Sequence, residues 1–350
     1  MITNKSIIEK AIAGEDPGFF AGLILTPLSS LYSIAVWLRL LLYRYNILRS
    51  KKVPCKVISV GNITVGGSGK TPMTLFLANK LKANGFSVSI LSRGYGRSNS
   101  KNSLLISDGK ELLADLHLAG DEPYLMANSI SDVPVAVASK RIDGAQLLID
   151  RFDPDVIILD DGFQHLSLQR DIDIVLIDDR VTKQARLLPH GPLREPLSAL
   201  NRAQLILSRG ATQSNFNNIA AQFFNFNYKV TSATELSSKK SFPISSMNGK
   251  KIFAFSALAR NDSFLKTLSD LGLTVSASLF FPDHHWYRDE DIDRIEELSK
   301  DCELIVTTEK DAVKITKIKK QLRNAFSINI SVEINNEEDF MELLSTKLKN

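Results

Sequence analysis

Glycines, a lysine and a hydroxyl group occur together at residues 61–71, where the chain reads Gly-Asn-Ile-Thr-Val-Gly-Gly-Ser-Gly-Lys-Thr. A β-prone run precedes this segment, and a helical pattern with Pro72 in its first turn follows it. A strand, a glycine-rich loop and a helix form the setting of a phosphate-binding P-loop. The sequence therefore predicts a nucleotide-phosphate site, although Thr64 stands where the strict pattern has glycine.

The predicted loop assigns a role to each of its polar groups. Lys70 would reach the β- and γ-phosphates of ATP, and the Thr71 hydroxyl would bind Mg²⁺. Backbone amides of the loop and of the helix N-terminus would hold the phosphates. The predicted nucleotide contacts are Thr64, Val65, Gly66, Gly67, Ser68, Gly69, Lys70 and Thr71.

Residues 155–161 supply the second half of a nucleotide site. Val156–Leu159 is a continuous apolar run, as expected of a strand buried on both faces, and Asp160 and Asp161 follow at its carboxyl end. Ligands of open α/β sheets bind at that end. Neighbouring strand side chains point to opposite faces, so one aspartate would hold Mg²⁺ and the other would face the nucleotide or the loop. The candidate magnesium ligands are thus Thr71, Asp160 and Asp161.

Further apolar runs alternate with helical patterns and predict the architecture. The additional β-prone runs of this part of the chain are residues 87–92, 133–138, 172–177 and 204–208. Such alternation is typical of an α/β fold with a doubly wound, mostly parallel sheet of the P-loop NTPase type. A polar stretch at residues 231–241 and a new alternation from residue 251 predict a second, smaller α/β lobe.

Three parts of the chain follow from these patterns. We expect a membrane-anchoring segment at residues 1–50, a P-loop core at residues 51–225, and the smaller lobe with a C-terminal tail at residues 226–350. The Lys-rich tail, residues 313–350, is expected to end in a short amphipathic helix that packs on the surface.

An uncharged run of 22 residues extends from Pro17 to Leu38. At 1.5 Å per residue, such a helix is long enough to cross a hydrocarbon core of about 30 Å. Pro27 is expected to interrupt the helix, and three serines reduce its hydrophobicity. The run therefore predicts a membrane anchor that either spans once or lies in the interface, and a buried core helix is the alternative.

Positive charge is concentrated in one segment. Residues 39–56 carry six positive charges and no acid, whereas the net charge of the whole chain is +4. The positive-inside rule puts this cluster in the cytoplasm, where it would meet anionic lipid headgroups. One local cluster is not a general polyanion surface, so we expect no nucleic-acid partner. Two cysteines, Cys55 and Cys302, are too few for a disulfide framework and indicate a reducing compartment.

Seven motifs occur in order along the chain. They are VGNITVGGSGKTP (60–72), LSRGYG (91–96), GDEP (120–123), LDDGFQH (159–165), GPLREPL (191–197), FPDHH (281–285) and TEKDA (308–312). Together they resemble the tetraacyldisaccharide 4'-kinase family. The resemblance implies phosphorylation of the 4'-hydroxyl of a tetraacylated glucosamine disaccharide 1-phosphate in lipid A biosynthesis, with ATP and Mg²⁺. It also implies that the enzyme works on inner-membrane lipid from the cytoplasmic face.

The resemblance further implies catalytic roles, with Lys70 in the phosphate loop. Asp121 would lie on a loop beside the acceptor and serve as its base. The residues alone favour another role for Asp121, as the cap of a helix that begins at Glu122. One of His284 and His285 would approach the active site from the second lobe, and adjacent side chains cannot both point there.

Polar residues in the other motifs are candidate ligand contacts. A guanidinium group suits a glycosyl 1-phosphate and an aromatic ring suits a sugar face, which makes Arg93, Tyr95 and Arg141 candidate substrate contacts. Gln164 and Arg194 are candidate nucleotide contacts. Glu195 would support the metal site or balance the charge of Arg194.

Two other classes of protein are weighed against these residues. A membrane-associated P-loop ATPase that acts as a switch or targeting factor would share the same loop and aspartate pair. It would hydrolyse ATP without making a phosphorylated lipid. A GTPase is rejected, because in Thr308-Glu-Lys-Asp311 the lysine falls one position late for the guanine-specifying motif.

Overall fold

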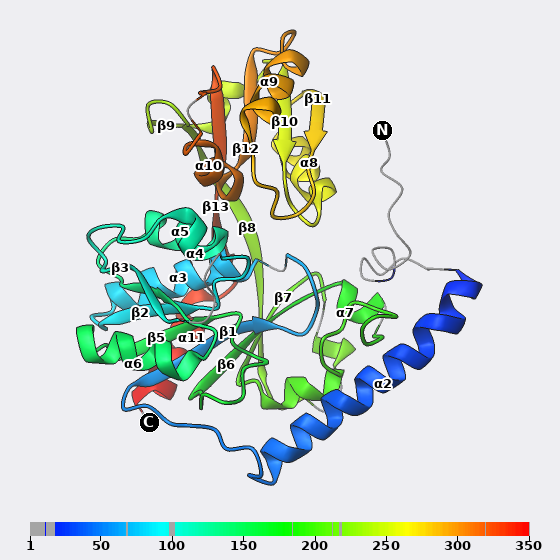
Figure 1. The fold of residues 1–350 in the computed structure, drawn as a ribbon, viewed down its shortest axis with the longest axis vertical. Helices are drawn as coiled ribbons and strands as arrows, with labels where there is room; N and C mark the ends of the chain where they lie inside the picture. Colours follow the sequence, from blue (N-terminus) through cyan, green and yellow to red (C-terminus); the bar gives the residue numbers. More distant parts are fainter. Residues whose placement is uncertain are drawn as a thin grey trace.

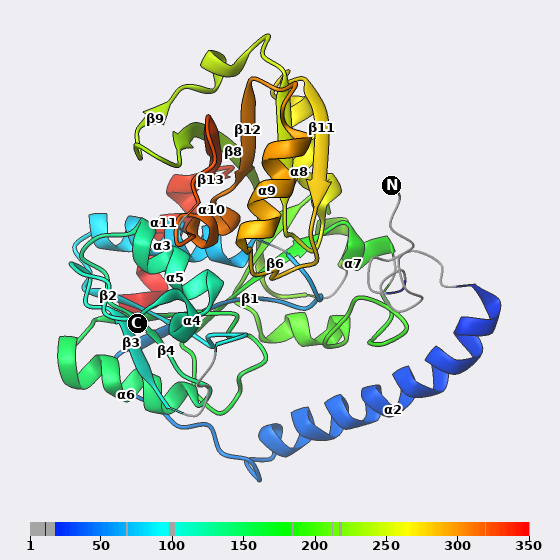
Figure 2. The ribbon, with the colours of Figure 1, turned by 45° about the horizontal axis from the view of Figure 1, so that its top comes forward.

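The structure is a computed structural model that describes residues 11, 18–67, 69–97, 102–183, 185–211, 213–216, 219–318 and 320–349. Ser68, one of the predicted nucleotide contacts, lies outside the described residues. Figures 1 and 2 show two lobes, with the strands β8 and β13 running between them and the long helix α2 along one side of the larger lobe.

Within the described residues, one sheet of 13 strands extends through both lobes in the order β11-β10-β12-β13-β8-β7-β6-β1-β5-β2-β4-β3, with β9 paired to β8. The strands are β1 (Lys56–Asn62), β2 (Val88–Ser92), β3 (Leu104–Ser107), β4 (Val135–Val137), β5 (Val156–Asp160), β6 (Ile172–Asp178), β7 (Leu205–Arg209), β8 (Gln222–Glu235), β9 (Ser241–Phe242), β10 (Ile252–Ser256), β11 (Val275–Phe280), β12 (Leu304–Thr308) and β13 (Ala325–Ile334).

The described residues also form α-helices, most of which lie between these strands along the chain, and three short 3₁₀ turns. They are α2 (Phe19–Arg44), α3 (Lys70–Ala83), α4 (Leu116–Ala119), α5 (Asp121–Ser129), α6 (Arg141–Phe152), α7 (Arg180–Lys183), α8 (Asn261–Asp270), α9 (Asp289–Leu298), α10 (Glu309–Ile315) and α11 (Glu337–Lys349). The 3₁₀ turns are η1 (Leu197–Arg202), η2 (Gln213–Asn215) and η3 (Ile244–Met247).

Strand β1, which leads into the P-loop, lies at the centre of the larger lobe and is covered on both faces. It pairs in parallel with β5 on one side and with β6 on the other. Ile58 and Val60 pack in the cluster that contains residues of α3, α5 and α11, whereas Val57 points the other way into the cluster that contains residues of α6. Helices on both faces of a mostly parallel sheet confirm the predicted doubly wound α/β fold.

The two lobes share the long strand β8. Its first residues pair in parallel with β7 of the larger lobe, from Gln222 to Asn225, and its later residues pair antiparallel with β13. The boundary expected at residue 226 therefore falls inside a continuous strand. From Asn225 to Thr231 its sequence alternates exposed polar residues with less exposed apolar ones, which is the period of a strand.

The C-terminal segment differs from the sequence expectation. Residues 325–334 form β13, which we did not predict, and α11 returns to the larger lobe, where Figure 1 shows the C-terminus. Phe340 of α11 is fully buried and contacts Phe224 edge-on, with 5.3 Å between ring centroids. The expected packing of this helix on the surface was therefore wrong, because its apolar face completes the core beside β13.

Helix α2 also corrects an expectation, because it continues through Pro27 without a break. Hydroxyl groups on either side of the proline bond to backbone carbonyls one turn back, from Thr26 to Gly22 and from Ser30 to Thr26. Within the described residues, α2 is the one helix long and apolar enough to cross a membrane, and only 6% of its most apolar window is buried.

Truncation of the buried Phe340 tests whether α11 belongs to the core. Phe340→Ala should lower the free energy of unfolding by about 3–5 kcal/mol, because it removes a fully buried aromatic ring. Urea unfolding measures the change. Leu298→Ala on α9 is the control, since that side chain is 47% exposed and should cost well under half as much. Equally small losses of unfolding free energy in the two variants would show that α11 packs on the surface.

Candidate active site

Two glycines give the P-loop its shape. Gly66 and Gly69 have φ angles of 90° and 77°, in the left-handed region that favours glycine, and Gly69 is the N-cap of α3. A Cβ atom at Gly69 would lie only 1.4 Å from the hydroxyl of Tyr228 on β8. The loop therefore requires glycine there both for its backbone conformation and for the close approach of the strand that links the lobes.

A buried ion pair, which the sequence analysis did not predict, contacts the P-loop at Thr64 and Val65. Arg180 forms a fork with the carboxylate of Asp178, at 2.9 Å and 2.6 Å. The same guanidinium donates to the carbonyl of Val65 at 2.9 Å and lies 3.4 Å from the hydroxyl of Thr64. The threonine at the position of the missing glycine is thus buried and held in place. Asp178 at the carboxyl end of β6 was the available signal, by the same rule that identified Asp160.

Asp160 and Asp161 lie side by side at the end of β5 but have different neighbours. Asp160 accepts a hydrogen bond from the Ser92 hydroxyl at 3.1 Å, and the Thr74 hydroxyl lies at 3.5 Å. Burial, aided by the charge of Asp161, raises the pKa of Asp160 to about 6. Asp161 turns into the left-handed region, with φ at 54°.

Asp161 is paired with cations instead. Arg194 donates two hydrogen bonds to its carboxylate, at 3.1 Å and 3.0 Å, and the ammonium group of Lys70 lies 3.6 Å away. Burial acts to raise the pKa of Asp161, but Lys70 and Arg194 hold it below its ordinary value. The structure therefore brings together the P-loop lysine, the aspartate pair and Arg194.

The donor set of this site fits magnesium. Within the described residues, no group of three or more His, Cys, Asp and Glu side chains is arranged to hold a metal ion. Mg²⁺ in nucleotide sites needs no such cage, because it takes one or two carboxylates, phosphate oxygens and waters. The buried Asp160 carboxylate, bonded to the Ser92 hydroxyl and with the Thr74 hydroxyl of α3 at 3.5 Å, supplies that kind of partial site.

The remaining predicted nucleotide contacts occupy different surroundings. Gln164 donates from its side-chain amide to the carbonyl of Asn62 at 2.8 Å, at the end of β1. Glu195 is buried and accepts a hydrogen bond from Arg202 at 2.6 Å, with Arg39 at 3.9 Å. Its charge is therefore balanced by these two arginines, while Arg194 turns to Asp161.

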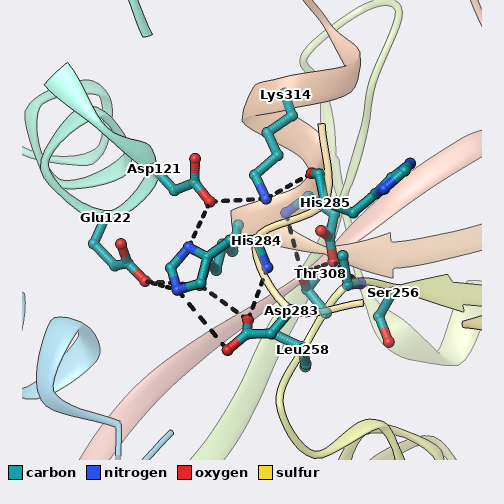
Figure 3. Close-up of polar contacts among 12 residues, drawn as sticks. Asp121, Glu122, Ser256, Leu258, Asp283, His284, His285, Thr308 and Lys314 are labelled. Atoms are coloured by element: carbon teal, nitrogen blue, oxygen red, sulfur yellow. Dashed lines mark hydrogen bonds and ion pairs between the residues drawn. The ribbon is translucent and has the colours of Figure 1, made fainter. Parts of the chain in front are cut away.

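Asp121 is the first residue of α5 and points toward the second lobe (Figure 3). Its carboxylate is buried, 2.8 Å from the ammonium of Lys314 and 3.1 Å from Nδ1 of His284. The expected loop position was wrong, because the helix begins at Asp121 itself. Gly120 is the N-cap and no side chain caps this helix, so the alternative role as a cap is also wrong.

The charges around Asp121 favour its ionised form. Burial acts to raise its pKa, but hydrogen bonds from His284 and Lys314 hold the pKa below the ordinary value. The same hydrogen bond raises the pKa of His284. Nε2 of His284 also lies 3.9 Å from Glu122 and 3.8 Å from Asp283. The result is an ionised carboxylate held by the ammonium group of Lys314 and by the His284 ring.

The two adjacent histidines point in different directions. His284 has a left-handed φ of 61° and turns toward Asp121. His285 contacts Asp291 at 2.9 Å through Nε2 and stacks on Phe281, with 4.7 Å between ring centroids. Only His284 of the pair therefore contacts the Asp121 carboxylate.

Sequence reasoning missed the two lysines of α10. Lys310 lies 2.7 Å from Glu122, and Lys314 contacts both Asp121 and the carbonyl of His285. Both ammonium groups link α10 of the second lobe to α5 of the larger lobe. Their spacing of four residues, which puts them on one face of a helix, was the available signal.

Of the predicted substrate contacts, Tyr95 lies beside these groups. Tyr95 is 68% exposed, and its ring centroid is 5.5 Å from that of His284. Arg141, the first residue of α6, is buried, donates to the Ala138 carbonyl at 2.8 Å and has no described partner for Nε. Its pKa is lowered to about 10 by burial, against the opposing charges of Asp160 and Asp161. Arg93, in the loop after β2, is exposed.

A P-loop, an aspartate pair at the end of the neighbouring strand and a buried carboxylate opposite a second lobe define the site. Together with the doubly wound sheet, these features are those of a P-loop phosphotransferase, in which catalysis depends on positioned charges.

Comparisons with known proteins identify the family. The model of the tetraacyldisaccharide-1-P 4'-kinase family matches residues 21–349, and the chain belongs to that family. The tetraacyldisaccharide 4'-kinase of Halothermothrix orenii is 38% identical, over 92% of this chain and 91% of its own. That of Syntrophus aciditrophicus is 37% identical over 96% of both chains. The crystal structure of LpxK from Aquifex aeolicus in complex with ATP aligns with a TM-score of 0.78 at 36% identity, over 92% of this chain and 98% of that one.

The raised pKa of Asp160 predicts how stability depends on pH in protein free of nucleotide and magnesium. A carboxylate whose folded pKa is raised destabilises the fold once it ionises, so the penalty begins near the unfolded pKa of about 4 and is nearly complete above about pH 6. Asp160→Asn removes the charge. Its gain in unfolding free energy should therefore rise by roughly 2 kcal/mol between pH 4 and pH 8, because each pKa unit is worth about 1.4 kcal/mol and part of the penalty is already present at pH 4. Urea unfolding at several pH values measures this, and a difference independent of pH would contradict it.

Proposed function

We propose that this chain transfers the γ-phosphoryl group of ATP to the 4'-hydroxyl of a tetraacylated glucosamine disaccharide 1-phosphate, a step of lipid A biosynthesis. One observation carries the proposal beyond family membership. The buried, ionised Asp121 carboxylate lies next to Tyr95 and His284, in the part of the site where an acceptor would approach a nucleotide on the P-loop. A switch ATPase would also position its attacking water with a polar group, so the phosphorylated lipid product is what separates the two functions.

The nucleotide side of the site uses the charges around the P-loop. Lys70 would follow the transferring phosphoryl group, and the backbone amides of residues 64–69 would hold the phosphates. Asp160, bonded to hydroxyl groups and ready for a cation, is the stronger candidate for Mg²⁺, together with Thr71. When bound, the metal would neutralise charge on the phosphates. Asp161 would orient Lys70 and Arg194, and Gln164 would support the end of β1.

The acceptor side uses Asp121 as the proton acceptor. A pKa below the ordinary value makes Asp121 a weak base, yet phosphoryl transfer through a loose transition state depends more on the position of the attacking hydroxyl than on base strength. His284 and Lys314 would hold the carboxylate in one orientation and stabilise its charge. Tyr95 would contact a sugar face, and Arg93 and Arg141 would bind the substrate phosphate.

The N-terminal helix supports a site of action at the cytoplasmic face of the inner membrane. We infer that α2 lies in the membrane interface. Its inward side chains bond to the core lobe, as Ser29 does to the Leu187 carbonyl at 2.8 Å, and its outward side chains are apolar. A helix held along the lobe in this way is suited to an interface more than to a span across the bilayer. The basic residues 39–56 would contact anionic lipid.

Substitution of Asp121 tests the proposed function. Asp121→Asn keeps the size of the side chain but cannot accept the proton. Phosphorylation of the acylated disaccharide 1-phosphate from radiolabelled ATP should fall by about 10²–10⁴-fold, while ATP affinity changes little. If the unmodified protein phosphorylated no lipid, the kinase proposal would be rejected in favour of an ATPase.

The two histidines supply a matched pair of variants for the same assay. His284→Gln should lower turnover by about 10–100-fold, because the Asp121 carboxylate loses the ring that contacts it at 3.1 Å and helps to orient it. His285→Gln should change turnover less than threefold in folded protein, because its ring contacts Asp291 and Phe281 instead. The reverse ranking would assign the role to His285.

The position of α2 is tested with single cysteines in protein whose Cys55 and Cys302 are replaced by serine. Phe20 and Tyr45, near the two ends of the helix, are 82% and 68% exposed. In membrane vesicles, an impermeant thiol reagent on the cytoplasmic side should label both Phe20→Cys and Tyr45→Cys if the helix lies in the interface. Labelling of Tyr45→Cys alone would show that the helix spans the bilayer.

A further inference from the structure

Helix α2 has two faces with different chemistry. Its outward side chains include five large apolar residues that are 60–66% exposed: Leu23, Ile24, Leu31, Ile34 and Trp37. Among its inward side chains, Ser29, Tyr32 and Arg39 donate to backbone carbonyls of the larger lobe. A purely lipid-facing anchor has no need of directed hydrogen bonds to the core, so the destinations of these bonds are informative.

The first of these bonds ends at a residue of the phosphoryl-transfer site. The hydroxyl of Tyr32 donates to the carbonyl of Arg194 at 2.8 Å. The amide of Arg194 donates in turn to the carbonyl of Ile63 at 2.7 Å, and its guanidinium forms the fork with Asp161. The backbone of Arg194 is thus held on one side by the end of β1 and on the other by α2.

A second bond ends at Gln164, which leads to the P-loop lysine through Asn62. The guanidinium of Arg39 donates to the carbonyl of Gln164. The side-chain amide of Gln164 donates to the carbonyl of Asn62 at 2.8 Å, and the Asn62 side chain lies 3.4 Å from the ammonium of Lys70. The contacts of Tyr32 and Arg39 therefore lead, through one residue or two, to Asp161 and Lys70.

We propose that Tyr32 and Arg39 are positioning residues for the nucleotide site. In this proposal α2 does more than attach the chain to lipid. It holds the carbonyls of Arg194 and Gln164, and through them it orients Asp161 and Lys70. The inference concerns the kinase of the proposed function, but the binding of MgATP can test it without an acceptor.

The helix offers a matched control for Tyr32. Ser29 stands one turn earlier, and its hydroxyl also donates to a core carbonyl at 2.8 Å, but that carbonyl belongs to Leu187. Leu187 pairs with the backbone of Leu193 and not with Arg194 or Gln164, the two residues whose side chains contact Asp161 and the end of β1. Tyr32→Phe and Ser29→Ala therefore each remove one hydroxyl donor from the same face of the helix. If the contacts only dock α2 on the lobe, the two variants should lose the same MgATP affinity.

The experiment measures full-length protein bound to vesicles that contain anionic phospholipid. Tyr32→Phe should weaken MgATP affinity, measured without acceptor, and lower kcat/KM for ATP by about 3–10-fold, as expected for loss of one hydrogen bond. Ser29→Ala should change both by less than twofold. Arg39→Lys keeps the charge for lipid contact but loses the planar guanidinium, and it should behave like Tyr32→Phe. All three variants should bind vesicles and unfold like the unmodified protein.

Two results would overturn the proposal. Equal losses in Tyr32→Phe and Ser29→Ala would reduce the contacts to general docking of the helix. A loss of vesicle binding in Tyr32→Phe that accounts for the lost activity would make Tyr32 part of the anchor only. If the unmodified protein phosphorylated no lipid, the proposed function would fail, while weaker MgATP binding by Tyr32→Phe alone would still support the positioning role.

Discussion

The buried carboxylate of Asp121 is the constraint on which the arrangement of the two lobes depends. Its side chain is 4% exposed, and that of its partner Lys314 is 1% exposed. A buried charge without a partner is costly, and breaking such a pair costs about 3–5 kcal/mol. Asp121 belongs to α5 of the larger lobe, whereas Lys314 and His284 belong to the second lobe. The lobes must therefore meet where the proposed base stands.

The links between parts of the chain reinforce this geometry. Strand β8 runs from the larger lobe into the second lobe, and Tyr228 on that strand touches Gly69 of the P-loop. On the opposite side, α2 reaches the same loop through Arg194 and Gln164. Phosphoryl transfer depends on fixed charges more than on covalent chemistry, so a site held from two sides suits the reaction.

Local patterns were enough to predict much of the architecture. The continuous apolar runs, the glycines and the carboxylates at strand ends depend on backbone preferences and short spacings, which sequence records directly. Strands β1, β2, β5, β6 and β7, the P-loop and the Asp160–Asp161 pair were therefore predicted close to their observed bounds. Strand β13 was missed although residues 327–334 alternate polar and apolar side chains with the period of a strand. The Lys-rich composition of residues 313–350 outweighed this signal, and the pairing with β8 joins segments far apart in the chain.

The sequence by itself determined the doubly wound fold, the nucleotide loop and the family, because each rests on residues close together in the chain or in ordered motifs. Only the tertiary structure decided which histidine faces Asp121, since His284 and Asp121 are 163 positions apart in the chain. It also decided that Lys310 and Lys314 belong to the site, and that α2 continues through Pro27 with its polar face on the core. These features arise from contacts between distant segments, whose charge balance and packing no local pattern encodes.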